Sequence, residues 1–178
     1  MKIFLTSAVI ILLVANVILT GTVLFKTPKI GYVRSQNLIY GYLGMKEAQS
    51  RFQEKTNQWQ TNTDTLRFDY QKSLSAYQQE YSKLSEKERK ERENLLELQK
   101  NNVLNYSDAV SKKAKEEEEK MTEGVLNQIN AFAEEFGKSE GYDIIFGTTL
   151  SGNLLYGNGA MDITDELLAG LNDKYKNK

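Results

Sequence analysis

The chain has 178 residues, enough for one domain with an extension. It contains no histidine and no cysteine, which excludes Ser–His triads, Cys–His nucleophiles and zinc fingers. The net charge of −1 gives no basic excess of the kind that nucleic-acid binders carry. The sequence also lacks a phosphate-binding loop, a dinucleotide-binding glycine motif and a nucleophile elbow. We therefore expect no enzyme, no catalytic residue, no cofactor, no metal site and no nucleic-acid partner.

The N-terminal segment, residues 1–26, is predicted to be a membrane anchor. Residues 3–25 carry no charge and are mostly aliphatic. As a helix they would be about 34 Å long, enough to cross a bilayer core of about 30 Å. This run is longer than that of a usual secretory signal, and Thr20-Gly21-Thr22 is a poor cleavage site. We expect an uncleaved transmembrane helix, with a cleaved signal as the alternative; both export residues 27–178.

Residues 45–140 are predicted to form a long helical hairpin. One apolar stripe at helical spacing runs from Ala48 to Leu84, and a second runs from Leu96 to Phe136. A helix with one narrow stripe is unstable alone in water, so the two stripes are expected to pack against each other. We place the reversal within residues 82–93, where Ser85 and Glu88 form a capping box that can begin a helix. A single uninterrupted helix is the alternative.

The regions on either side of the hairpin are predicted to form a small body. Residues 29–34 and 142–149 are predicted strands, and residues 154–156 are a third, joined to the second by a turn at Ser151-Gly152-Asn153. Thr164 is predicted to cap a last helix. That helix would bury three leucines: Leu167, Leu168 and Leu171.

Neither flank could build a hydrophobic core alone, so residues 29–44 and 141–178 are expected to share one body. The predicted fold class is α+β. It comprises a small β-rich body, a long antiparallel α-helical hairpin and an N-terminal transmembrane or signal helix. Three short strands leave exposed edges, and we expect subunits to pair through them.

Several stretches resemble the Skp/OmpH family of periplasmic chaperones. The most specific is D-I-T-D-E-L-L at residues 162–168, preceded by G-N-L-L-Y at residues 152–156; I-G-Y-V at residues 30–33 agrees with it. The resemblance covers about residues 29–175. It implies a homotrimer with a β-rich body and three coiled-coil hairpins around a cavity. Such a protein holds unfolded outer-membrane proteins in the periplasm without ATP. This chain would do so from an inner-membrane anchor or, if the signal is cleaved, as a soluble protein.

Exposed aromatic side chains on the hairpin are the candidates for client contact. They are Trp59, Phe68, Tyr77, Tyr81 and Tyr106. All except Phe68 lie on or beside the apolar stripes, and for those four we favour simple packing between the helices. Phe68 lies off its stripe and is therefore the strongest candidate.

A different class of function remains open, namely a membrane-anchored coiled-coil protein that spaces or tethers parts of the cell envelope. The b subunit of ATP synthase has the same combination of an N-terminal anchor and a long charged helix. Residues 152–168 argue against a plain stalk, because a stalk needs no such body.

Overall fold

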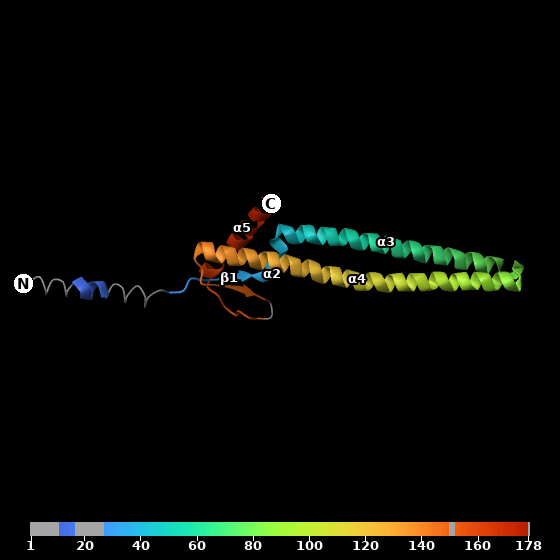
Figure 1. Cartoon of the computed structure of the whole chain (residues 1–178), viewed down its shortest axis with the longest axis horizontal. Helices are drawn as coiled ribbons and strands as arrows, with labels where there is room; N and C mark the ends of the chain where they lie inside the picture. Colours follow the sequence, from blue (N-terminus) through green and yellow to red (C-terminus); the bar gives the residue numbers. More distant parts are fainter. Residues whose placement is uncertain (1–10, 17–26, 150–151, 178) are drawn as a thin grey trace, which may run out of the picture.

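The structure, a computed structural model, describes residues 11–16, 27–149 and 152–177. A long hairpin of two helices projects from a small body (Figure 1). In chain order, the elements after residue 27 are β1 (Ile30–Arg34), α2 (Ser35–Gly41), α3 (Leu43–Glu80), the 3-10 helix η1 (Tyr81–Lys83), α4 (Glu86–Glu140), β2 (Ile144–Thr148), the 3-10 helix η2 (Gly159–Met161) and α5 (Thr164–Lys176).

The predicted N-terminal anchor lies mostly outside the described residues. Of residues 3–25, only 11–16 are described; they are helical and exposed. Among the described residues, no helix combines the length and the apolar character needed to cross a bilayer. The anchor and the alternative of a cleaved signal therefore both remain predictions.

Helices α3 and α4 form the predicted hairpin. Near the body the Tyr42 hydroxyl donates to Gln128 Oε1 at 2.7 Å, and near the tip the Tyr77 hydroxyl donates to Glu93 Oε1 at 2.5 Å. The residue numbers of such pairs fall on one helix as they rise on the other, so the helices are antiparallel. The alternative of one uninterrupted helix is thereby wrong.

Both ends of α4 follow local sequence signals. At its start the Ser85 and Glu88 side chains each accept a hydrogen bond from the other residue's backbone N–H, so the predicted capping box is confirmed. The helix ends at Glu140 because Gly141 adopts a left-handed conformation with φ of 71°. With 55 residues, α4 is about 80 Å long at 1.5 Å per residue.

The sheet consists of two parallel strands. Its register runs from Ile30 opposite Ile144 to Arg34 opposite Thr148. Parallel strands need a long crossover connection, and the whole helical hairpin supplies it here. The two flanks of the hairpin, which are predicted to share one body, meet in this sheet.

The predicted third strand, residues 154–156, is wrong, and so is the β-rich body. These residues form a loop, and Ser151 of the predicted turn lies outside the described residues. The side chain of Asn153 takes up the hydrogen bonds that a strand pair would have used. It accepts from Thr149 N at 2.9 Å and donates to Gly147 O at 2.6 Å. The body is consequently mostly helical.

The second edge of β1 is covered by the segment before α5. Tyr32 bridges Asp162 in parallel, and Ile163 N donates to Tyr32 O at 3.0 Å. Helix α5 begins at Thr164, so the prediction that Thr164 is the N-cap is off by one residue, and Ile163 occupies that position. The capping acceptor is instead the side chain of Asp162, which Thr164 N reaches at 3.1 Å.

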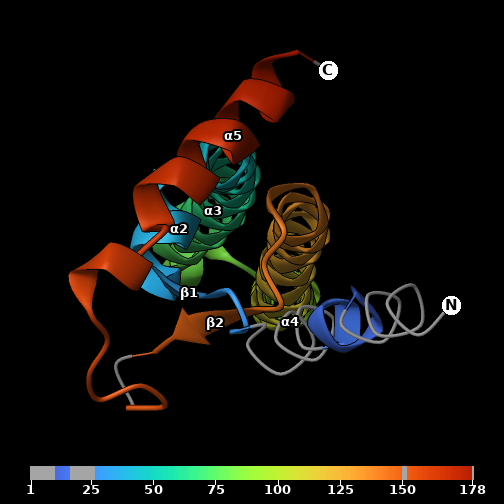
Figure 2. The same ribbon diagram turned by 90° about the vertical axis from the view of Figure 1, so that its left-hand side faces the viewer.

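One hydrophobic core joins the two flanks of the hairpin to its base. Seen from the body end, α5 and α2 lie beside the base of α3, while β2 lies beside α4 (Figure 2). The predicted burial of Leu167 and Leu171 is confirmed, and Leu168 packs partly buried against them. The fully or nearly buried apolar residues are Val33, Leu38, Tyr42, Val125, Ile129, Ile163, Leu167 and Leu171.

Candidate functional site

The five aromatic candidates divide by exposure. Phe68 is 63% exposed and Tyr81 is 46% exposed. Trp59, Tyr77 and Tyr106 are half-buried between the helices. The stripe positions thus lie largely inside the hairpin, as their spacing indicates, while Phe68 on the outer side of α3 is free to contact another molecule.

Tyr77 and Tyr81 pack the tip of the hairpin. Their rings meet edge to face with centroids 5.5 Å apart, and the Arg89 guanidinium lies 4.2 Å from the Tyr81 ring centroid. The hydrogen bond to the Glu93 carboxylate raises the pKa of the Tyr77 hydroxyl to about 12, so this phenol remains a donor over the whole physiological range. These contacts favour a packing role for Tyr77, with part of Tyr81 left accessible.

Trp59 and Tyr106 lie further toward the body. Asn62 Nδ2 donates to the Tyr106 hydroxyl at 3.1 Å, and the Lys113 ammonium lies 5.6 Å from the Trp59 ring centroid. Beside them Thr63 is buried and donates to Trp59 O at 2.9 Å. Both aromatic side chains therefore help to join α3 to α4.

Three leucines on α4 are exposed and were not among the predicted contact residues. Leu95, Leu98 and Leu104 are 47%, 59% and 57% exposed. For two of them the sequence signal is an aliphatic residue directly next to the stripe, since Leu95 and Leu104 adjoin the stripe residues Leu96 and Val103.

The three leucines lie at the same height on the hairpin as Phe68. The pairs Asn62–Tyr106 and Tyr77–Glu93 fix the antiparallel register, so residues 95–104 lie level with the α3 segment that holds Phe68. We call Phe68, Leu95, Leu98 and Leu104 the distal apolar band.

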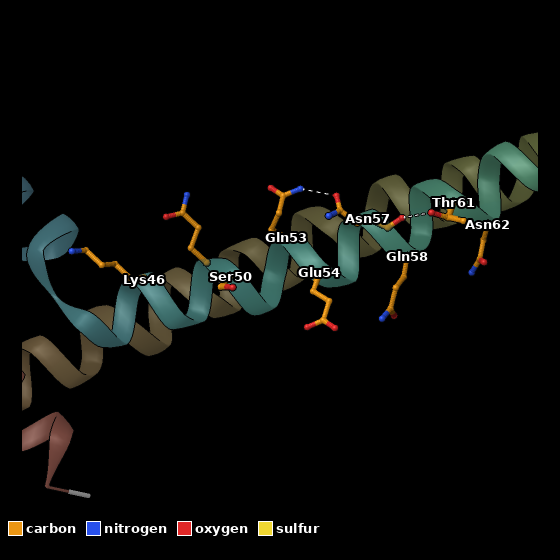
Figure 3. A pocket seen from close by; sticks show the side chains of 9 residues that line it. Lys46, Ser50, Gln53, Glu54, Asn57, Gln58, Thr61 and Asn62 are labelled. Carbon is orange, nitrogen blue, oxygen red and sulfur yellow. Dashed lines mark hydrogen bonds between the residues drawn. The ribbon is translucent and has the colours of Figure 1, made fainter.

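The half of α3 nearer the body presents a polar outer face (Figure 3). Seven neutral polar residues and only two charged ones line a shallow depression there. They are Gln49, Ser50, Gln53, Asn57, Gln58, Thr61 and Asn62, with Lys46 and Glu54. On α4 the corresponding region carries Glu118, Glu119 and Glu123 beside Leu126, which is 36% exposed. Exposed apolar side chains on the hairpin are thus concentrated in its distal half.

The profile of the family described as Outer membrane protein (OmpH-like) matches residues 29–171. The chain belongs to the OmpH-like family. The predicted resemblance is thereby confirmed. No curated protein matches the sequence significantly.

The fold of this OmpH-like chain is shared with a solved structure. A proposed outer membrane chaperone (OmpH-like) from Caulobacter crescentus superposes with a TM-score of 0.75 at 16% identity. The match covers 83% of this chain and 86% of that one. At this identity the likeness shows the fold, namely the long hairpin on a small body.

The body of this OmpH-like chain carries a second apolar surface, which we call the body patch. Two of its residues, Ile144 and Phe146, lie on the open face of the sheet and are 44% and 49% exposed. Leu155 and Tyr156, in the loop that lines a hollow with Tyr32, are 93% and 83% exposed. So many large apolar side chains together on a small surface are typical of an interface with another protein.

Within the part of the chain that the structure describes, no group of three or more acidic side chains is placed to hold a metal ion. The distal apolar band and the body patch are exposed apolar surfaces on the hairpin and on the body, respectively.

Proposed function

We propose that this OmpH-like protein is an ATP-independent holdase chaperone that binds unfolded outer-membrane proteins in the periplasm. The observation that carries the proposal is the distal apolar band, four large apolar side chains exposed on helices that the body holds in place. The chain belongs to a family whose description is Outer membrane protein (OmpH-like), and this description supports the choice of client. The chaperone description of the Caulobacter crescentus structure agrees with it.

The band binds clients by many weak contacts. Burying one leucine side chain contributes about 1.5–3 kcal/mol, which is too little to trap a client permanently. Several such contacts on linked hairpins add through effective concentration. The band can therefore hold a chain of almost any sequence and release it without an energy source.

Two further features complete the proposal. The body patch joins three copies into a homotrimer, so that three hairpins surround one client. Residues 3–25 anchor each copy in the inner membrane; the apolar length of this segment supports the anchor. Resistance of the full-length protein to carbonate extraction tests it, and release into the soluble fraction would favour a cleaved signal.

The function is tested by removing the band while preserving the fold. We expect the variant with Phe68, Leu95, Leu98 and Leu104 all changed to Ser to lose most suppression of aggregation of an unfolded β-barrel protein diluted from urea. The matched control changes four exposed polar residues of α3 to Ser: Gln53, Asn57, Gln58 and Thr61. Circular dichroism verifies that both variants remain helical. Equal protection by both variants would refute the assignment.

Single substitutions separate client contact from packing. Phe68→Ala is expected to weaken client protection with little change in melting temperature, because Phe68 is exposed. Tyr77→Ala is expected to lower the melting temperature, because it removes the hydrogen bond to Glu93 and the ring contact with Tyr81. Melting curves and the aggregation assay on the same preparations give both readouts. The reverse pattern would exchange the two roles.

The alternative function is a membrane-anchored coiled-coil protein that spaces or tethers the envelope. The length of the hairpin and the ion pairs on its surface, such as Lys55–Glu117, would also suit a rigid spacer. A spacer needs no exposed leucines, so the Ser substitutions in the band would leave its function intact.

A further inference from the structure

The chain enters the body through a tightly held residue, Lys29. Its backbone N–H donates to Asp143 Oδ2 at 2.7 Å, and its carbonyl accepts from Asp143 N at 2.8 Å. Its ammonium donates to Glu140 O at 2.8 Å and lies 3.9 Å from the Tyr142 ring centroid. A cation at the C-terminal end of a helix is favoured by the helix dipole. We call Lys29 with these three partners the Lys29 clamp.

The Lys29 clamp is at the opposite end of α4 from the hairpin tip. Glu140 is the last residue of α4 and Glu86 is its first, next to the turn. The clamp and the tip are therefore about 80 Å apart, the length of the helix. Figure 1 shows the same separation, with β1 in the body and the turn between α3 and α4 at the far end.

The covalent chain keeps the Lys29 clamp close to the apolar segment. That segment ends at Phe25, and only Lys26, Thr27 and Pro28 separate it from Lys29. Four extended residue steps span at most about 14 Å. If residues 3–25 cross a bilayer, the clamp must lie within this distance of the membrane surface.

A short tether alone would still allow the hairpin to lie flat on the membrane, but its charge opposes this. Residues 45–140 contain 16 basic and 19 acidic side chains, a net charge of −3. A surface that binds anionic lipids carries a cluster of basic residues, whereas the hairpin is acidic overall. At the clamp, Lys26 and Lys29 balance the carboxylates of Glu140 and Asp143, so no acidic excess opposes the headgroups there.

We infer that the anchored protein stands on the bilayer, with the Lys29 clamp at the lipid headgroups and the hairpin tip pointing away. This inference rests on the membrane anchor proposed above. The distal apolar band then lies roughly 54–68 Å from the clamp, counting 1.5 Å per residue of α4. Clients are consequently captured well away from the inner membrane, and the open end of the hairpins faces outward.

Fluorescence transfer to the bilayer tests the orientation. The native chain has no cysteine, so single thiols can be introduced at three exposed serines along the hairpin. Ser139→Cys lies next to the clamp, Ser111→Cys at mid-height and Ser82→Cys at the tip. Full-length protein with a donor dye on each thiol is reconstituted into phosphatidylcholine–phosphatidylglycerol vesicles that carry a headgroup acceptor. We expect strong transfer from position 139, several-fold less from 111 and none from 82.

The possible results of this experiment distinguish a wrong orientation from a wrong membrane anchor. If the protein fails to float with the vesicles, the anchor is wrong and the orientation falls with it. If it floats and all three positions transfer equally, the hairpin lies flat, which would overturn the inference while leaving the anchor intact. Strongest transfer from position 82 would place the clamp far from the bilayer, which the short tether forbids, and would overturn the anchor as well.

A matched variant tests the role of the tether. A flexible Gly/Ser linker of about twenty residues between Thr27 and Pro28 relaxes the distance limit by roughly 25 Å. Transfer from position 139 should then fall while flotation persists. Unchanged transfer would show that the body binds the membrane by itself, and the tether argument would be wrong.

Discussion

Asp162 shows how one side chain can connect distant parts of the body. Its carboxylate accepts from Thr164 N at 3.1 Å and pairs with Arg34 Nε at 3.0 Å. It also accepts from the Thr164 hydroxyl, while Thr164 Oγ1 accepts from Arg34 N at 2.9 Å. The end of β1 and the start of α5 are thereby held together by a small polar network at the edge of the core.

The network sets the protonation of Asp162. Burial raises the pKa of this carboxyl, but the hydrogen bonds from Thr164 and the Arg34 charge outweigh burial and hold the pKa below its usual value. A lowered pKa in the folded state stabilises the fold above the unfolded pKa of about 3.9. The stabilisation is lost as the pH falls through the lower folded value.

Asp162→Asn is expected to lower the free energy of unfolding at pH 7 by about 1–2 kcal/mol, through the weaker helix cap and the lost ion pair. The deficit should shrink as the pH falls below about 4, because the unfolded wild-type chain then binds a proton at Asp162, and it should vanish once the pH is below the lowered pKa of the folded state. Urea unfolding at a series of pH values measures both effects. Asp108→Asn, in an exposed pair with Lys112, is the control and should cost less than about 0.5 kcal/mol. A deficit that does not depend on pH would contradict this account of Asp162.

At the scale of the elements, the hairpin turn depends on a few polar contacts. Tyr81–Lys83 form a single 3-10 turn, and α4 begins three residues later at Glu86. No glycine or proline marks this reversal. The Ser85–Glu88 capping box is thus the local signal that starts the second helix.

Ser85→Ala should lower stability by about 1 kcal/mol, because it leaves the Glu88 N–H without its capping acceptor. The change is measured as a shift of the urea midpoint at fixed protein concentration. Ser82→Ala is the matched control, since Ser82 is an exposed residue of the same turn that does not cap α4. If the two substitutions had equal effects, the box would have no special role in the turn.

The elements also show where local patterns mislead. The stripes predicted α3 and α4 because every residue of a long helix repeats the same local geometry. Residues 154–156 look like a strand by composition but lack a partner, because Asn153 occupies the neighbouring backbone groups. A strand exists only if another strand accepts its hydrogen bonds, and a short apolar run does not contain that information.

At the scale of the molecule, the body patch predicts self-association. A thin body with a two-stranded sheet leaves Ile144 and Phe146 exposed, and Tyr156, which lines a hollow with Tyr32, is exposed as well. The loop here lies directly on the sheet, since a Cβ on Gly157 would be only 2.5 Å from the Tyr32 ring. The patch is therefore part of a defined surface on which another copy can pack.

Phe146→Asp should dissociate the proposed trimer, because it places a carboxylate in the middle of the body patch. The folded chain should tolerate it, since Phe146 is 49% exposed. Light scattering should report a drop in mass from three chains toward one. Phe68→Asp, on the hairpin, is the control and should leave the mass unchanged. A trimer that survives Phe146→Asp would place the interface elsewhere.

The sequence alone determined the helical hairpin, its capping box, the shared body and the family, because periodicity, caps and short motifs are properties of neighbouring residues. It also singled out Phe68, which lies off the apolar stripe. Only the tertiary structure decided the parallel pairing of β1 with β2, the ion pair of Arg34 with Asp162 and the exposure of Leu95, Leu98 and Leu104. These features depend on contacts between segments more than a hundred residues apart, or on how one helix is rotated against the other, and no local pattern specifies either.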